Sequence, residues 1–176
     1  KKENSVIAAL GTMTSAVIPE GVTSIGSSAF YNCRSIPNDF FTPLVNLTRI
    51  GSSAFGYCTG LTAVELPAGL KTISGSAFEG CTGLTELTIP SGVTFMGEKM
   101  VKGCTKLAKL TIPYVGRRSD DTYGGSGVGR YYTRLDWLVS GSDSTSSRPS
   151  ALKEVIVTDA TELKEYAFGG WNSRET

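Results

Sequence analysis

The sequence contains no histidine, the side chain that most often serves as a general base or zinc ligand near neutral pH. Ser-His-Asp triads, Cys-His pairs and His-ligated zinc are therefore excluded. The chain also lacks any apolar run of about 18 residues, so no membrane-spanning helix is predicted. Its 17 basic and 16 acidic residues nearly cancel, and we expect neither nucleic acid nor an anionic membrane surface as a partner.

Four cysteines recur at a regular spacing, and each closes a similar phrase. The phrases are SAFYNC, SAFGYC, SAFEGC and KMVKGC, which end at Cys33, Cys58, Cys81 and Cys104. The last three cysteines are 23 residues apart. A fixed period of roughly 20 to 30 residues indicates a solenoid of stacked repeats. The cysteines are therefore one structural position occupied four times.

Each repeat carries a strand pattern followed by turns. In the copy at 84–104, Leu87 and Ile89 alternate with polar residues, which predicts a short, half-buried strand. A Pro-x-Gly turn follows at 90–92, and a second short inward segment begins at Val93. The Ala-Phe pair of the repeat predicts a tight helical or 3₁₀ turn. One unit cannot bury its apolar side alone, so we expect neighbouring units to stack with parallel strands.

The copies differ in completeness. The skeleton L-x-x-L-x-I-P-x-G-L/V-x-x-I-x-x-x-A-F-x-G-C is followed at 61–81 and, without its first strand, at 18–33. A two-residue insertion falls within 36–43. A last copy begins at Leu152, and Trp171 occupies the place of its cysteine. Because no polar capping repeat is visible, we expect a fragment or module of a longer protein.

The phrase I-P-x-G-V-x-x-I-G-x-x-A-F-x-x-C, from Ile18 to Cys33, resembles the BspA-like leucine-rich repeats of bacterial surface proteins. The resemblance covers roughly 16–115 and 151–171. It implies a leucine-rich repeat solenoid, in which short parallel strands stack with 3₁₀ or helical turns and irregular segments. It also implies an extracellular, often cell-surface location. Some members of that family are linked to adhesion to host proteins or to other cells.

The cysteine row has a structural interpretation and a chemical one. Side chains in register point the same way, so their Cβ atoms stay about as far apart as neighbouring strands, beyond the usual disulfide spacing of about 3.8 Å. This favours a ladder of free, buried thiols that pack as small hydrophobic groups. Metal binding is disfavoured because ligands must converge, whereas these residues form a row.

Outward side chains of the strands should line up between coils in two rows. One row is Ala63, Glu86, Lys109 and Glu154, and the other is Glu65, Thr88, Thr111 and Ile156. The alternating charges of the first row favour cross-strand ion pairing on a solvated face. Two carboxylates facing one cleft could instead hydrolyse glycosidic bonds, which leaves a carboxylate-based hydrolase as a less favoured alternative.

The repeat is interrupted by an insertion at 116–150, rich in Gly, Ser, Tyr and Arg. Tyr, Trp and Arg dominate binding hot spots, and insertions in solenoids are often functional. The candidate binding residues are Tyr123, Arg130, Tyr131, Tyr132, Arg134 and Trp137. The competing interpretation is that the apolar residues of 135–139 fold back and cover a coil edge, close to the outward Ile156. A third is disorder, and the serine run at 140–150 resembles a linker.

We therefore expect 1–176 to form a single leucine-rich repeat domain, with regular repeats at about 16–115 and 151–171. The predicted function is an extracellular or cell-surface protein-interaction or adhesion module without catalytic activity. It needs no cofactor or metal, and its expected partner is a protein or glycan on a host or neighbouring cell. The alternative is a structural spacer that carries another functional domain.

Overall fold

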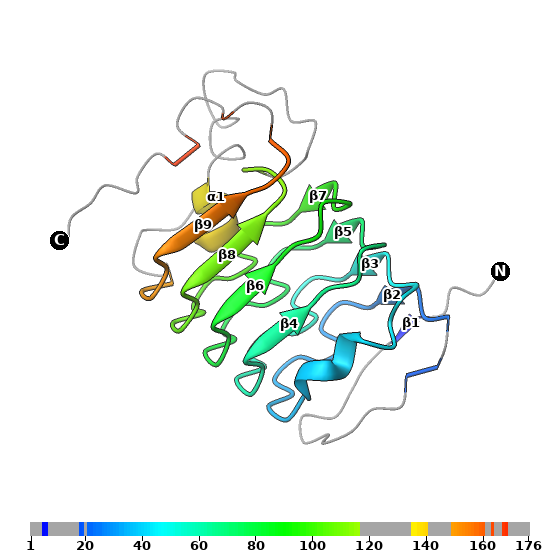
Figure 1. Cartoon of the computed structure of the whole chain (residues 1–176). Coiled ribbons are helices and arrows are strands. Elements are labelled where there is room, and N and C mark those ends of the chain that lie inside the picture. Colours follow the sequence, from blue (N-terminus) through cyan, green and yellow to red (C-terminus); the bar gives the residue numbers. More distant parts are fainter. Residues whose placement is uncertain are drawn as a thin grey trace.

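A computed structural model describes residues 5–6, 18–19, 21–116, 135–140, 149–160, 163 and 167–168. The chain winds into stacked coils, which together build two sheets of parallel strands (Figure 1). One sheet has the order β1-β2-β3-β5-β7 and the other β4-β6-β8-β9. Neighbours in each sheet come from successive coils, so residues one repeat apart lie side by side.

The first sheet consists of two-residue strands: β1 (Ser5–Val6), β2 (Ser24–Ile25), β3 (Arg49–Ile50), β5 (Thr72–Ile73) and β7 (Phe95–Met96). The second sheet has longer strands: β4 (Ala63–Glu65), β6 (Glu86–Thr88), β8 (Lys109–Ile112) and β9 (Glu154–Val157). Every pairing between these strands is parallel. The predicted leucine-rich repeat solenoid is confirmed.

The core runs along the axis of the solenoid as columns of like residues. Phe30, Phe55 and Phe78 form one column, with ring centroids 5.3 and 5.5 Å apart and nearly parallel planes. These side chains are at most 2% exposed, because the rings of adjacent coils pack against one another. Each buried aromatic ring contributes about 1.5–3 kcal/mol through burial. A coil therefore completes its core only when its neighbours are in place.

The turns that carry the Ala-Phe pairs, or Met100-Val101 in the fourth copy, stack into what we call the turn ladder. It consists of residues 26–33, 51–58, 74–81 and 97–104. Along each turn, successive backbone N–H groups donate alternately to the next coil and to the same turn. Those of Ser28, Phe30 and Asn32 donate to carbonyls of the next coil, at 2.8, 2.8 and 2.7 Å. Those of Ala29 and its alternate neighbours donate three residues back within the same turn. Consecutive turns, rather than a helix, result.

The short insertion at 36–43 forms the 3₁₀ helix η1 (Asn38–Phe41), which lies beside β4 (Figure 1). The Asn38 Oδ1 atom accepts hydrogen bonds from the backbone N–H of Thr62 and Ala63, at 3.2 and 3.4 Å. Its Nδ2 group donates to the Thr62 hydroxyl at 2.8 Å. Since an unpaired strand edge can pair with another chain, η1 protects this end of the second sheet.

Helix α1 (Leu135–Val139) lies inside the predicted insertion and extends the turn ladder (yellow in Figure 1). The backbone N–H groups of Lys99 and Val101 donate to the carbonyls of Trp137 and Leu138, at 2.8 and 3.2 Å. The Leu135 N–H donates in turn to the Ala167 carbonyl at 2.8 Å. The helix therefore occupies the place of the next Ala-Phe turn, and the stacking of coils continues beyond the interruption.

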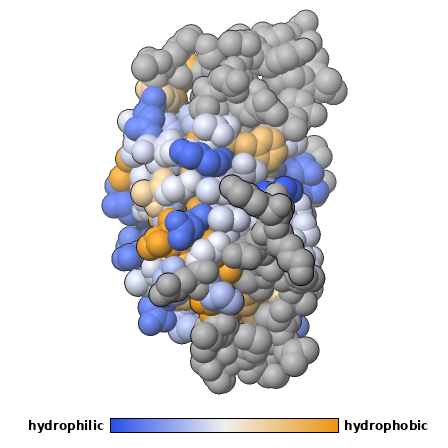
Figure 2. Space-filling view, turned by 90° about the vertical axis from the view of Figure 1, so that its right-hand side faces the viewer, coloured by the Kyte–Doolittle hydropathy of each residue, from blue (hydrophilic) through white to orange (hydrophobic). Residues whose placement is uncertain are grey.

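The last repeat is less well buried than the others. Leu163 and Phe168 are 54% and 38% exposed, whereas Ala167 is buried. Trp171 lies outside the described residues. Figure 2 views the solenoid from the side on which the two-residue strands lie in Figure 1, and its coloured surface intersperses hydrophobic with hydrophilic residues. Hydrophobic burial is therefore directed mainly inward, toward the axis of the coils.

Replacing Asn38 with Ala is expected to lower the free energy of unfolding by about 1 kcal/mol, because two backbone N–H groups of the β4 edge lose their acceptor. Urea denaturation monitored by circular dichroism measures the change. Asn46→Ala, at another exposed asparagine, is the control and should change stability by less than about 0.5 kcal/mol. Equal effects of the two substitutions would contradict the capping role of Asn38.

Candidate functional site

The outward side chains of the second sheet form the two predicted rows. The strand register pairs Ala63 with Glu86, Glu86 with Lys109, and Lys109 with Glu154. The second row, Glu65, Thr88, Thr111 and Ile156, is also confirmed by the register. The predicted cross-strand pairing is present at Lys109 and Glu154, whose Nζ and Oε2 atoms lie 3.4 Å apart.

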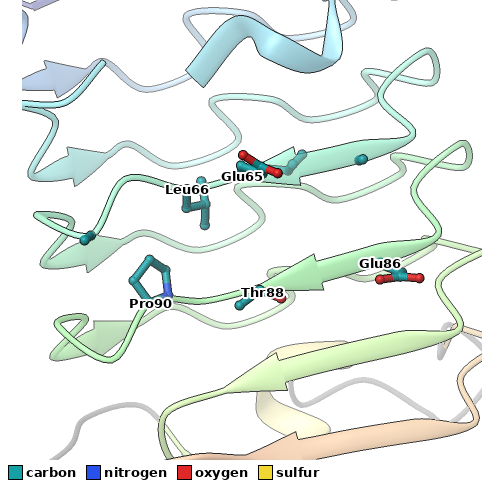
Figure 3. Close-up of a pocket in the computed structure, with 8 residues that line it drawn as sticks. Glu65, Leu66, Glu86, Thr88 and Pro90 are labelled. Carbon is teal, nitrogen blue, oxygen red and sulfur yellow. The ribbon is translucent and has the colours of Figure 1, made fainter. Parts of the chain in front are cut away.

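A shallow hollow of about 460 Å³ lies on this face, and we call it the strand-face groove. It is lined by Ala63, Val64, Glu65, Leu66, Ala68, Glu86, Thr88 and Pro90. Figure 3 shows Leu66 and Pro90 beyond the ends of β4 and β6, and Glu86 at the start of β6. The groove is therefore apolar at one end, at Leu66 and Pro90, and acidic along the strands, at Glu65 and Glu86. The small side chains of Ala63 and Ala68 leave the space that larger residues would fill.

Two carboxylates, Glu65 and Glu86, share this groove from adjacent strands (Figure 3). Glu65 pairs in register with Thr88, so the two glutamates are diagonal neighbours two residues apart along the strands. Strand geometry puts their Cα atoms roughly 8 Å apart. Both side chains are exposed. The residues that line the groove include these two carboxylates and no cation, while the neighbouring Lys109 forms its ion pair with Glu154, so the groove favours a positively charged occupant.

This arrangement meets the first requirement of the carboxylate-based hydrolase, two acidic residues in one cleft. A catalytic acid, however, is usually held in an apolar pocket that excludes water. Glu65 and Glu86 are solvent-exposed, and no aromatic side chain lines the groove to support a sugar. The site is better suited to binding than to acid–base catalysis.

Of the candidate binding residues in the insertion, the structure describes Trp137, which is half-buried in α1. Its neighbours Leu135, Leu138 and Val139 are fully buried, so this part of the insertion packs on the solenoid. Tyr123, Arg130, Tyr131, Tyr132 and Arg134 lie outside the described residues. Helix α1 also supplies carbonyl acceptors to the turn ladder, so this part of the insertion is an ordered element of the solenoid rather than a loose linker.

The four cysteines are free and buried, as predicted. Each thiol from the second coil onward donates to the phenylalanine carbonyl of the preceding coil: Cys58 to Phe30, Cys81 to Phe55 and Cys104 to Phe78, with distances of 3.0, 3.1 and 3.1 Å. Burial raises the pKa of all four thiols above the ordinary range, for Cys104 to about 12. Nucleophilic or metal-binding thiolates are not formed under such conditions. Within the described residues, no cluster of potential metal ligands occurs.

The fold is thus that of a leucine-rich repeat protein with buried cysteine and phenylalanine columns. The sequence profile of the BspA type leucine rich repeat region matches residues 4–121 in six copies, which is more than half of the chain. The chain belongs to this family. Leucine-rich repeat proteins typically act as binding modules rather than as catalysts.

Solved structures share the fold at low sequence identity. A leucine rich cell surface protein from Faecalibacterium prausnitzii has a TM-score of 0.61 and 20% identity over 89% of this chain and 36% of that protein. The pneumococcal vaccine antigen PcpA has a TM-score of 0.59 and 22% identity over 93% of this chain and 35% of the antigen. The chain thus spans about a third of the length of these two proteins.

None of the helices in the described part of the chain has the length and apolar character needed to cross a membrane. No curated protein matches the sequence.

The buried thiols should make stability fall as the solution becomes alkaline. In the unfolded chain a thiol ionises near pH 8.5, whereas burial keeps Cys104 protonated up to about pH 12. Between these values the unfolded state binds fewer protons, so each thiol lowers the free energy of unfolding by up to about 1.4 kcal/mol per pH unit. Urea denaturation of Cys104→Ala between pH 9 and about 10.5 should show a shallower slope than the wild-type protein. Identical slopes would show that the thiol titrates equally in both states.

Proposed function

We propose that this chain is a protein-interaction module of a cell-surface protein, and that the strand-face groove is its docking site. The observation that carries the proposal is the groove itself, in which exposed Glu65 and Glu86 lie beside the apolar Leu66 and Pro90. Membership of a repeat family and the cell-surface description of one structural neighbour support the location. The module displays this groove on a stacked sheet and performs no chemistry.

The groove is suited to an extended segment of a partner protein that presents a lysine or arginine next to an apolar side chain. The cation would lie between Glu65, which faces Thr88 in the strand register, and Glu86. Glu86 faces Lys109 in the register, but the Lys109 ammonium forms its ion pair with Glu154 on the other side. The apolar neighbour would rest on Leu66 and Pro90. Because successive coils hold the strands in place, the residues of the groove should lose little conformational entropy when a partner binds.

The aromatic and basic residues of the insertion provide a second proposed contact. Arg130, Tyr131, Tyr132 and Arg134 precede α1 directly in the sequence, and α1 itself is anchored to the turn ladder. A recognition segment attached to such an anchor would lose less conformational entropy on binding than a segment in a free tether. Its proposed partner is a protein or glycan on a host or neighbouring cell.

The groove is tested by binding of a fluorescent peptide that contains alternating lysine and leucine, followed by anisotropy. The double variant Glu65→Gln/Glu86→Gln should weaken binding about tenfold or more, and rising salt should weaken wild-type binding. Glu154→Gln, on the same sheet but outside the groove, is the matched control and should bind like wild type. Equal binding by the double variant and the wild-type protein would place the docking site elsewhere.

The insertion is tested with the quadruple alanine variant of Arg130, Tyr131, Tyr132 and Arg134, which leaves the half-buried Trp137 in place. Immobilised extracellular-matrix proteins and whole cells serve as targets in a surface-binding assay. We expect the variant to lose at least about tenfold in affinity while its urea midpoint stays unchanged. Undiminished binding would remove the insertion from the interface. Failure of the wild-type protein to bind any target would favour the alternative function, a structural spacer that carries another functional domain.

A further inference from the structure

Two exposed tyrosines stand together on the turn ladder, on a different side of the coil from the strand-face groove. Tyr31 and Tyr57 are 48% and 44% exposed. Their ring centroids are 5.5 Å apart and the ring planes meet at 65°. Most aromatic rings among the described residues are buried in the core, so this exposed pair departs locally from the inward direction of hydrophobic burial.

The fold has no need of a tyrosine at either position. Tyr57 occupies the place that Gly80 and Gly103 hold in the next two coils and Asn32 in the coil before, as the hydrogen bonds to successive coils show. All four residues have left-handed backbone, with φ of 59° at Tyr57, 58° at Asn32 and 71° at both glycines. Glycine adopts this conformation freely and asparagine tolerates it, whereas a bulky ring is strained there.

Tyr31 corresponds in the same way to Gly56 of the next coil. The turn therefore closes in other coils with a glycine in place of either ring. Of the two tyrosines, Tyr57 has the strained backbone, and its ring faces solvent rather than the core. Strained residues of this kind cluster at functional sites. The turn thus does not require the two tyrosine rings for folding, and their presence calls for another explanation.

The two rings are held against the backbone of the coil that follows. A Cβ atom added to Gly56 would lie 3.0 Å from the Tyr31 ring, and one added to Gly80 would lie 2.6 Å from the Tyr57 ring. The rings are thus supported from one side by backbone that carries no side chain. A pair of supported, exposed rings is a preorganised stacking surface.

Hydrogen-bonding groups lie next to this surface. Asn32 adjoins Tyr31 in sequence and lies across from Tyr57 in the ladder. Its Oδ1 atom accepts a hydrogen bond of 3.1 Å from Nε of Arg34, which orients the guanidinium relative to the amide. Both side chains are exposed. The amide Nδ2 and the guanidinium Nη groups are donors suited to hydroxyl or carboxylate oxygens.

We propose that Tyr31, Asn32, Arg34 and Tyr57 form a glycan-binding site that takes an acidic pyranose. A pyranose has a flat C–H face, which would stack on the exposed rings, and acceptor oxygens around its edge, which would meet the amide and the guanidinium. A peptide would need pockets for successive side chains, whereas this surface is a pair of rings next to bare backbone. The site does not depend on the strand-face groove.

The test uses an immobilised panel of uronic-acid oligosaccharides, with neutral cello- and chito-oligosaccharides beside them, and saturation-transfer NMR of the bound sugars. The wild-type chain should bind uronic-acid members more tightly than neutral ones. Tyr57→Gly and Tyr31→Gly install the residues of the equivalent positions, so both proteins should fold, and each should lose about tenfold or more in affinity. Arg34→Gln should remove the preference for the acidic sugars.

The double variant Glu65→Gln/Glu86→Gln is the control that separates this site from the groove. It should bind the oligosaccharides like wild type, while the tyrosine variants should bind the lysine-leucine peptide like wild type. Absence of wild-type binding to every sugar in the panel would overturn the proposal, as would unchanged affinity in both glycine variants. Tyrosine-dependent binding of a proline-rich peptide without sugar binding would assign the surface to a protein instead.

Discussion

The structure depends on the alternation of hydrogen bonds in the turn ladder. Every second N–H group, as at Ser28, Phe30 and Asn32, donates to the following coil, and those between donate within their own turn. Left-handed backbone at Ser28 and Asn32 brackets this segment. A buried N–H without a partner costs a large part of a hydrogen bond, so the turn can close only against a neighbouring coil in one register. That register aligns the strands and the phenylalanine column.

The same constraint explains the cysteine column. The Phe30 carbonyl accepts a hydrogen bond from the Cys33 N–H of its own turn and another from the Cys58 thiol of the next coil. The position requires a small, apolar side chain that can still donate weakly, and cysteine combines these properties. Alanine would leave the second bond unmade, and a larger residue would disturb the close-packed column. The thiols are therefore structural groups, and the recurring spacing reports the fold rather than a chemical site.

The sequence predicted the features that follow from periodicity and could not predict those that depend on local exceptions. The 23-residue period and the alternation around Leu87 predicted the solenoid, the parallel strands and both outward rows. Periodicity assigns a residue to the inside or the outside but does not say where neighbouring side chains leave a hollow, so the groove at Glu65 was missed. The 3₁₀ helix η1 depends on side-chain hydrogen bonds of Asn38, which no repeat pattern contains.

The insertion shows why an interruption of a repeat need not interrupt the fold. The apolar pattern stops after Tyr114, yet the open N–H groups of Lys99 and Val101 still require acceptors. Helix α1 supplies them through backbone carbonyls, which any sequence can provide, and buries Leu135 in place of an Ala-Phe pair. The fold thus requires particular residue types only at positions whose side chains enter the core. Outward positions of a solenoid can change without disturbing the ladder, and it is at such positions that Glu65 and Tyr57 depart from what folding requires.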